Sequence, residues 1–193
     1  MGRELTLTID YDSIDFDDLL NDWKVIPFNR KWRNYEDPSK YIKSVNKFGE
    51  AIPANIGIAR KLDCQTAFFL SCYQHSGVAW SLLGDGMQCP WDSTKHAGIL
   101  MLSPNIPKDK RVEAAQSVLE EYNAFCNGEV YWYSLEDSDG NDVSSCTGFL
   151  GLDSLGQGIR EILSEGDFIG EVRGGAKCLA EYLDLPMKKK EAV

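Results

Sequence analysis

The chain has 193 residues, of which 43% are hydrophobic and 11% aromatic, and its formal net charge is −10. This length and apolar content are sufficient for a buried core and exclude an intrinsically disordered chain. No run of roughly eighteen apolar residues is present, which excludes a membrane-spanning helix, and residues 1–6 lack the apolar stretch of a secretory signal. The six cysteines are therefore expected to be reduced thiols of a cytoplasmic protein.

The negative charge restricts the partners that the sequence favours. Nucleic acid binds proteins whose cations replace its counterions, so we expect no direct contact with nucleic acid. A basic protein, by contrast, would be attracted to such a surface. The one basic run, residues 188–190, lies in a segment, 186–193, that we expect to be a flexible tail.

At the N-terminus, alternating apolar and polar side chains predict a half-buried strand over residues 4–10. Asp12 and Ser13 then form a plausible N-cap, which predicts that a short helix follows. Its apolar side would carry Phe16, Leu19, Leu20 and Trp23.

A second helix is predicted to begin at Asp37-Pro38, because a capping carboxylate followed by proline is typical of a helix start. Gly49 would end it. The expected buried stripe consists of Tyr41, Ile42, Val45 and Phe48.

The middle of the chain predicts three strands and a helix. Residues 66–73 are apolar on both faces, which is typical of a central strand, and residues 77–83 would return beside it. Residues 98–102 are a third buried strand. Apolar side chains at three- and four-residue spacing predict an amphipathic helix over residues 108–126.

A hairpin follows, with strands at 130–136 and 142–149 around Asp139-Gly140, a dipeptide typical of a tight turn. This register would place Tyr133 opposite Cys146 and Tyr131 opposite Gly148. Ser154 and Gln157 resemble a capping box, and a last helix would end at Pro186. The apolar sides of these two helices would carry Leu155, Ile159, Ile162 and Leu163, and then Leu179, Tyr182 and Leu183.

Strands occur in adjacent runs and do not alternate one for one with helices, which favours the α+β class. The sequence contains no internal repeat and no obvious linker. We therefore expect one compact α+β domain over residues 1–185, with a mostly antiparallel sheet covered by helices.

The chemically richest part of the chain is the segment that contains both histidines. Cys72, His75, Cys89 and His96 would supply the thiolates and imidazoles of a zinc site, although a straight strand points Cys72 and His75 to opposite faces. Cys89 could instead be a nucleophile activated by His75 and oriented by Asp92. Structural thiols and ordinary surface histidines explain the same residues. We therefore assign no metal and no cofactor.

Two acidic segments have alternative interpretations. Residues 137–142 are rich in oxygen donors, but the position of the glycine and the absence of a terminal glutamate favour a hairpin turn over a calcium loop. Asp15, Asp17, Asp18 and Asp22 lie on or beside the first predicted helix, where they could imitate a row of phosphates. A solvated face with favourable first-turn charges is the alternative.

Three parts of the sequence together resemble a family of uncharacterised proteins encoded by bacteriophages and other mobile elements. They are residues 74–77 (Gln-His-Ser-Gly), residues 88–93 (Gln-Cys-Pro-Trp-Asp-Ser), and residues 128–131 (Gly-Glu-Val-Tyr) with 146–149 (Cys-Thr-Gly-Phe). In that family the segments D-H-S-G, C-x-W-D-S and G-E-V-Y-G with a later D-S-C-W-G-F-Y-G recur in the same order. Gln74 and Thr147 replace an aspartate and a tryptophan, which removes the carboxylate that the family pattern places beside His75.

The resemblance implies a host-directed role, since mobile elements often encode inhibitors of restriction or CRISPR nucleases. We therefore expect a small, acidic, non-enzymatic protein of the host cytoplasm. It would bind and inhibit a basic nuclease or DNA-binding complex through Asp15, Asp17, Asp18 and Asp22. The alternative is a Cys/His-dependent enzyme or zinc protein centred on residues 72–96, with His75, Cys89 and Asp92 at its site. The oligomeric state is left open.

Overall fold

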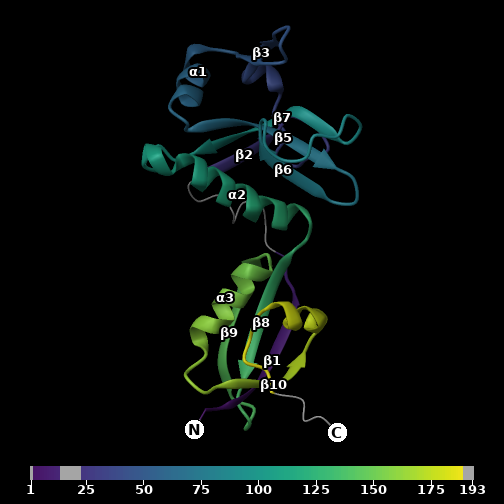
Figure 1. Ribbon diagram of the computed structural model, residues 1–193, viewed down its shortest axis with the longest axis vertical. Coiled ribbons are helices and arrows are strands. Elements are labelled where there is room, and N and C mark those ends of the chain that lie inside the picture. Colours follow the sequence, from purple (N-terminus) through teal and green to yellow (C-terminus); the bar gives the residue numbers. More distant parts are fainter. Residues whose placement is uncertain (1, 14–22, 189–193) are drawn as a thin grey trace. The chain divides into compact units, whose positions relative to one another are not determined.

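A computed structural model describes residues 2–13 and 23–188 (Figure 1). The chain forms two compact units: residues 1–15 with 128–193, here called the terminal unit, and residues 16–127, here called the central unit. Each unit contains its own four-stranded sheet. The predicted α+β class is confirmed. The expectation of one compact domain over residues 1–185 stays a prediction, and among the described residues two hydrophobic clusters each lie within one unit.

The sheet of the terminal unit has the strand order β10-β1-β8-β9, in which β1 and β10 are parallel and the other pairs antiparallel. Alternation along β1 places Leu5, Leu7 and Ile9 on the buried face, as predicted. Helix α3 and the 3₁₀-helix η4 pack against this core. The elements are β1 (Glu4–Tyr11), β8 (Val130–Glu136), β9 (Asp142–Leu150), α3 (Leu152–Ile162), β10 (Phe168–Arg173) and η4 (Lys177–Tyr182).

A buried carboxylate joins the beginning and the end of the terminal unit. Asp167, which is 5% exposed, accepts hydrogen bonds from the backbone N–H of Arg3 at 2.8 Å and from its guanidinium at 2.6 Å. The backbone N–H of Ser164 donates to the same carboxylate. These donors, the Arg3 side chain foremost, hold the pKa of Asp167 far below its usual range.

The β8–β9 hairpin matches the predicted register only in part. Tyr133 faces Cys146, as predicted. Tyr131 faces Phe149 and not Gly148, because the ladder shifts by one residue between Tyr131 and Tyr133. Gly148 has a φ of +79°, a conformation that side chains rarely adopt, and it lies in this irregular part of the strand.

The sheet of the central unit is antiparallel throughout, with the order β2-β7-β5-β6. The predicted central strand, its returning partner and the third buried strand are β5, β6 and β7. The predicted amphipathic helix is α2, which packs mainly against β6 (Figure 1). The bounds are β2 (Trp23–Pro27), β5 (Ala67–Gln74), β6 (Val78–Leu82), β7 (Ser93–Leu102), η3 (Lys108–Lys110) and α2 (Arg111–Cys126).

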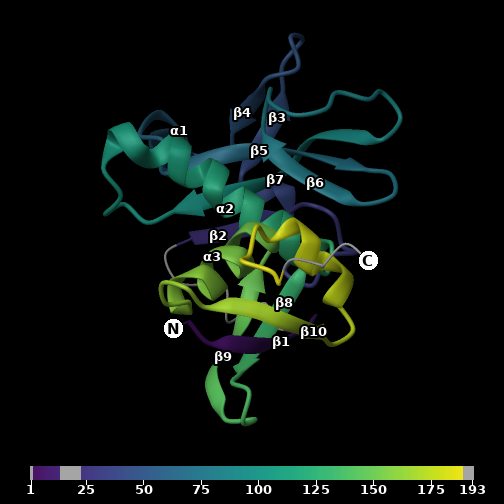
Figure 2. The ribbon, with the colours of Figure 1, turned by 60° about the horizontal axis from the view of Figure 1, so that its bottom comes forward.

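A smaller layer covers another part of the central sheet. Tyr41 and Ile58 pack there with Phe69 and Ile99 of the sheet in one buried cluster. Figure 2 shows the β3–β4 hairpin of this layer extending beyond the sheet. The elements are η2 (Pro38–Lys40), β3 (Ile42–Val45), β4 (Ala51–Pro53) and α1 (Ile56–Asp63).

The prediction of a helix over residues 37–49 is wrong. Asp37 does cap a helical start by accepting a hydrogen bond from the N–H of Ser39, but the helix ends after one turn. The chain then forms the β3–β4 hairpin, whose turn contains Gly49 at a φ of +83°. Val45 and Phe48, predicted to be buried, are 52% and 76% exposed.

The C-terminal predictions also need corrections. Helix α3 begins without a side-chain cap, so Ser154 and Gln157 do not form a capping box. The last helix is a 3₁₀-helix, and Tyr182 on it is 68% exposed. The tail predicted over 186–193 is ordered at its beginning, since the N–H of Lys188 donates to the carbonyl of Ile169 in β10.

The helix predicted after Ser13 lies outside the described residues except for Trp23, which begins strand β2. Among the described helices, none is both long and apolar enough to cross a membrane.

Candidate functional site

His75, Cys89 and Asp92 lie close together at one end of the central sheet. His75 follows β5, and the loop between β6 and β7 supplies Cys89 and Asp92. The Asp92 Oδ2 atom lies 3.5 Å from His75 Nδ1 and 3.5 Å from Cys89 Sγ. Local hydrogen bonds fix the loop, because the Ser93 hydroxyl donates to the Met87 carbonyl and accepts from the N–H of Cys89.

The order of these three groups differs from that of a catalytic triad. In a cysteine nucleophile site the imidazole contacts the thiol, and the carboxylate lies behind the imidazole. Here the carboxylate lies between the other two groups and contacts both. The His75 side chain is 68% exposed. Trp91, which lies between Cys89 and Asp92 in the same loop, is 92% exposed. The sequence therefore predicted the proximity of the trio but not its order.

The predicted zinc ligands do not converge. Cys72 is buried and its sulfur accepts a hydrogen bond from the Gln74 amide, while burial raises the pKa of the thiol. His96 is directed to the Gly49 carbonyl. Within residues 2–13 and 23–188, no group of three or more His, Cys, Asp or Glu side chains is arranged to hold a metal ion.

The acidic loop at the β8–β9 turn is structural. The carboxylate of Asp137 accepts hydrogen bonds from the backbone N–H groups of Asp139 and Asn141, and these bonds lower its pKa, the Asn141 side chain contributing most. Of the two central turn residues only Gly140 has a positive φ. The hairpin interpretation accounts for this loop, although the turn is longer than the two-residue one predicted.

The four aspartates predicted to bind a partner, Asp15, Asp17, Asp18 and Asp22, lie outside the described residues. Two neighbouring aspartates are described. Asp12 accepts a hydrogen bond from the N–H of Gly148 at 2.9 Å, and Asp10 accepts one from the N–H of Tyr11. Asp12 therefore has a structural role at the irregular part of β9.

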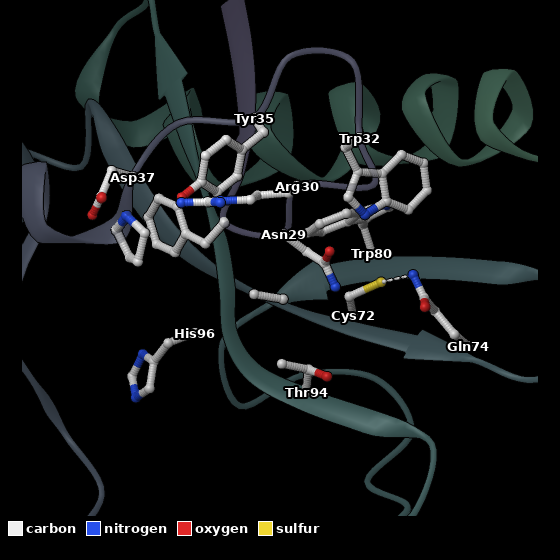
Figure 3. A pocket seen from close by; sticks show the side chains of 13 residues that line it. Asn29, Arg30, Trp32, Tyr35, Asp37, Cys72, Gln74, Trp80, Thr94 and His96 are labelled. Atoms are coloured by element: carbon white, nitrogen blue, oxygen red, sulfur yellow. Dashed lines mark hydrogen bonds between the residues drawn. The ribbon is translucent and has the colours of Figure 1, made fainter.

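A cavity of about 660 Å³ in the central unit is a second candidate site (Figure 3). Its volume is within the range of small-molecule sites. Side chains of β5, β6 and β7 and the segment 28–38, which joins β2 to η2, line it. The rings are those of Phe28, Trp32, Tyr35 and Trp80, the neutral polar groups belong to Asn29, Gln74, Thr94 and His96, and the charges are those of Arg30 and Asp37.

A second hollow of about 360 Å³ adjoins this cavity. Trp32 and Gln74 line both. The smaller hollow is otherwise lined by Lys31, by the turn 75–77 between β5 and β6 and by Val78, so it includes His75. The two hollows therefore share a boundary at Trp32 and Gln74.

Hydrogen bonds hold the second half of the segment 28–38 to strand β2 and to the residues that follow the segment. The Asn34 amide donates to the Val25 carbonyl, and the carboxylate of Glu36 accepts from Lys24, Lys40 and the hydroxyl of Tyr41. The hydrogen bond from Lys40 contributes most to lowering the pKa of Glu36 to about 2. The cavity therefore has a wall with defined geometry.

This wall is also basic. The segment 28–38 contains three Lys or Arg and two Asp or Glu, and the flanking residues 24–27 and 39–47 add four lysines and no acidic residue. The Arg30 guanidinium lies over the ring of Tyr35, 5.8 Å from its centroid, and the Lys31 ammonium lies 5.6 Å from the centroid of Trp32. An anionic ligand is consequently favoured here over a cationic one.

His96 presents an unsatisfied acceptor at the margin of the cavity. Its φ is +51°, and its Nε2 lies 2.9 Å from the carbonyl oxygen of Gly49. Because a carbonyl only accepts, Nε2 carries a proton, and in the neutral imidazole Nδ1 is then an acceptor. Nδ1 is buried and has no hydrogen-bond partner among the described residues. Trp80 Nε1 also lacks a well-formed hydrogen bond, but it lies beside the Cys126 thiol. Burial raises the pKa of this thiol to about 12, and the N–H of Trp80 partly opposes that increase.

This cavity was not predicted from the sequence. The available signal was the alternation of aromatic and basic residues over 28–35, Phe-Asn-Arg-Lys-Trp-Arg-Asn-Tyr. Such alternation is typical of surfaces that stack bases and attract phosphates. Its significance was hidden by the negative charge of the whole chain.

Comparisons of this chain with protein-family models, with curated proteins and with solved structures found no match in any of the three.

Proposed function

We propose that this protein acts by binding, and that its terminal unit binds a basic protein surface. The observation that carries the proposal is the distribution of charge. Residues 1–15 and 128–193 contain seventeen acidic and seven basic residues, whereas residues 16–127 contain thirteen of each. The whole net charge of −10 therefore belongs to the terminal unit, and a basic partner would be attracted to that unit.

Within the terminal unit, the β8–β9 loop is the proposed contact surface. Asp139 and Asp142 are exposed, and neither forms an ion pair with a described residue. Figure 2 shows this hairpin extending past β1 and β10 of its own unit. The quartet Asp15, Asp17, Asp18 and Asp22 remains a predicted second contact.

We further propose that the partner is a nucleic-acid-handling defence protein of a host cell, of the restriction or CRISPR type, which the chain inhibits in the cytoplasm. Such proteins have cationic grooves for phosphates, and carboxylates can occupy the same grooves. The resemblance of residues 66–151 to proteins of mobile elements supports this choice of partner.

The test is affinity capture from a host lysate at low and at moderately high salt, followed by identification of the captured proteins. The double variant Asp139→Lys with Asp142→Lys is compared with Asp153→Lys with Glu165→Lys, which makes the same charge change at other exposed positions of the terminal unit. We expect basic nucleic-acid-binding proteins to be captured at low salt and lost at high salt.

The variant with lysines at Asp139 and Asp142 should no longer capture these proteins, and the control with lysines at Asp153 and Glu165 should still capture most of them. Capture that does not depend on salt would contradict the proposal, as would an equal loss for both variants or an absence of basic proteins among those captured.

The contacts of Asp92 favour a second candidate, an enzyme that uses His75, Cys89 and Asp92. It requires Cys89 to be more reactive than an ordinary thiol. Iodoacetamide labelling of the native protein at pH 7, with Cys64, Cys146 and Cys178 as exposed internal references, tests this requirement. Labelling of Cys89 much faster than of the three references would favour the enzyme; equal or slower labelling would remove it.

A further inference from the structure

We infer that the two adjoining hollows of the central unit form a nucleotide-binding site, with the base in the larger hollow and the phosphate in the smaller one. This site is separate from the acidic surface proposed above and does not depend on it. The inference rests on the shape, the charge and the unsatisfied acceptor of the site.

The larger hollow suits a flat heteroaromatic ring. Three rings of its wall, those of Phe28, Trp32 and Tyr35, are partly exposed and offer stacking surfaces. The planar guanidinium of Arg30, which lies over Tyr35, provides a further surface on which a base can stack. Figure 3 shows the rings of Trp32 and Tyr35 and the side chain of Arg30 around the opening.

His96 adds a specific polar contact. Buried acceptors are rarely left without a donor, so the free Nδ1 atom is a position at which a ligand N–H would be stabilised. Each of the common bases has an N–H group on its ring edge. In the view of Figure 3, His96 lies across the cavity from Trp32 and Trp80.

The smaller hollow suits a phosphate. Lys31 supplies the ammonium, Ser76 a hydroxyl and His75 an imidazole. Lys31 now donates a hydrogen bond to the side-chain oxygen of Gln74, and a phosphate oxygen would be a stronger, charge-assisted acceptor. Because Trp32 and Gln74 line both hollows, a ligand needs to cross only this shared boundary to fill them.

The charge of the central unit permits such an anion. Its net charge is zero, and the segment that forms the cavity wall is basic. The expectation that the chain does not contact nucleic acid was drawn from the net charge of the whole chain, which is carried by the terminal unit. The same site chemistry would accept a free nucleotide or one nucleotide of a single strand.

Calorimetric titration of the full-length protein with AMP, CMP, GMP and UMP tests the inference. We expect at least one of them to bind saturably, with the matching nucleoside and ribose 5-phosphate each about tenfold weaker or more, because each fills only one hollow. A tetranucleotide of the same base distinguishes the two sources. Binding more than about tenfold tighter than the mononucleotide would indicate a single strand, and equal binding a free nucleotide.

Two variants with the same charge change locate the site. Lys31→Ala should weaken binding of the nucleotide about tenfold and leave binding of the nucleoside unchanged, because it removes only the phosphate contact. Lys43→Ala removes a lysine of the same basic segment that lines neither hollow, and it should change neither affinity. Trp32→Ala should weaken both ligands, and circular dichroism and thermal melting verify that each variant is folded.

The inference is overturned if none of the four nucleotides binds saturably at millimolar concentration. Equal weakening by Lys31→Ala and Lys43→Ala would also overturn it, since that result indicates non-specific attraction. Nucleosides that bind as tightly as nucleotides would exclude the phosphate site.

Discussion

Asp167 has the least exposed carboxylate among the ion pairs of the described residues: its side chain is 2% exposed, and that of Arg3 is 44% exposed. A carboxylate in this position depends on its donors, because removal of a partner leaves a polar group out of water and unsatisfied. Arg3, at the start of the chain, is therefore important for the β1–β10 end of the terminal unit.

Replacing Asp167 with Asn preserves the shape and removes the charge, and we expect the thermal midpoint of the terminal unit to fall by several degrees at pH 7. The folded-state pKa of Asp167 is depressed, so its contribution is fully present above the pKa of the unfolded carboxyl group, about 4. The contribution is lost as the pH falls from there towards the folded-state pKa. Denaturation of wild type and Asp167→Asn at pH 7 and pH 3 measures this, and a stability difference that stays the same at both values would contradict it.

At the residue scale, the sequence showed which groups lie near one another along the chain but not how they contact. His75, Cys89 and Asp92 were grouped because of their chemistry, and the pairing of Tyr73 with Ser93 across β5 and β7 brings their segments together. Which atom contacts which depends on side-chain rotamers that a sequence does not determine. The pairing of Arg3 with Asp167 spans 164 positions and has no local signal at all.

Strand β6 lies at the edge of the central sheet, and two asparagines of helix α2 form hydrogen bonds with its outward-facing backbone groups. Asn123 accepts a hydrogen bond from the N–H of Trp80 at 2.7 Å and donates to its carbonyl at 3.0 Å. Asn127 makes the same pair of bonds with Val78. Four residues along a helix and two along a strand span similar distances, so the amides replace a neighbouring strand. This protects an edge that would otherwise be open to pairing with other chains.

Asn123→Ala should lower the free energy of unfolding by about 2 kcal/mol, because it removes two hydrogen bonds and leaves the backbone groups of the buried Trp80 without partners. It should also promote association through the uncovered edge. Urea denaturation and light scattering measure the two effects. Gln116→Ala, at an exposed position of the same helix, is the matched control and should change neither; a similar loss in both variants would show that the edge contact is unimportant.

At the element scale, long and strongly patterned segments were predicted correctly. Strand β5 is an apolar run of strand length, and helix α2 repeats apolar side chains at three- and four-residue spacing. The segment 37–49 failed because its cap and proline describe only the first turn, whereas Ile42 and Val45, both β-branched, pair across to β4. Strand β10 was missed because Gly170 interrupts its short pattern, and its place beside β1 is a long-range pairing.

For the whole molecule, the net charge was an incomplete guide because it averages two units of different character. The terminal unit carries all of the excess negative charge, and the central unit is neutral with a basic wall around its cavity. A sequence that alternates acidic and basic regions has to be divided into its units before its charge can exclude a class of ligand.

Two of the hydrophobic clusters among the described residues lead to a prediction about unfolding. One contains residues of the terminal unit alone and the other residues of the central unit alone, so a substitution in one should leave the packing of the other intact. In Asp167→Asn, we expect hydrogen exchange to accelerate in the amides of β1 and β8 and to remain at the wild-type rate in β5 and β7. Asn123→Ala should produce the opposite pattern, and the two variants serve as controls for each other. Acceleration in all four strands in either variant would mean that the units unfold as one cooperative structure.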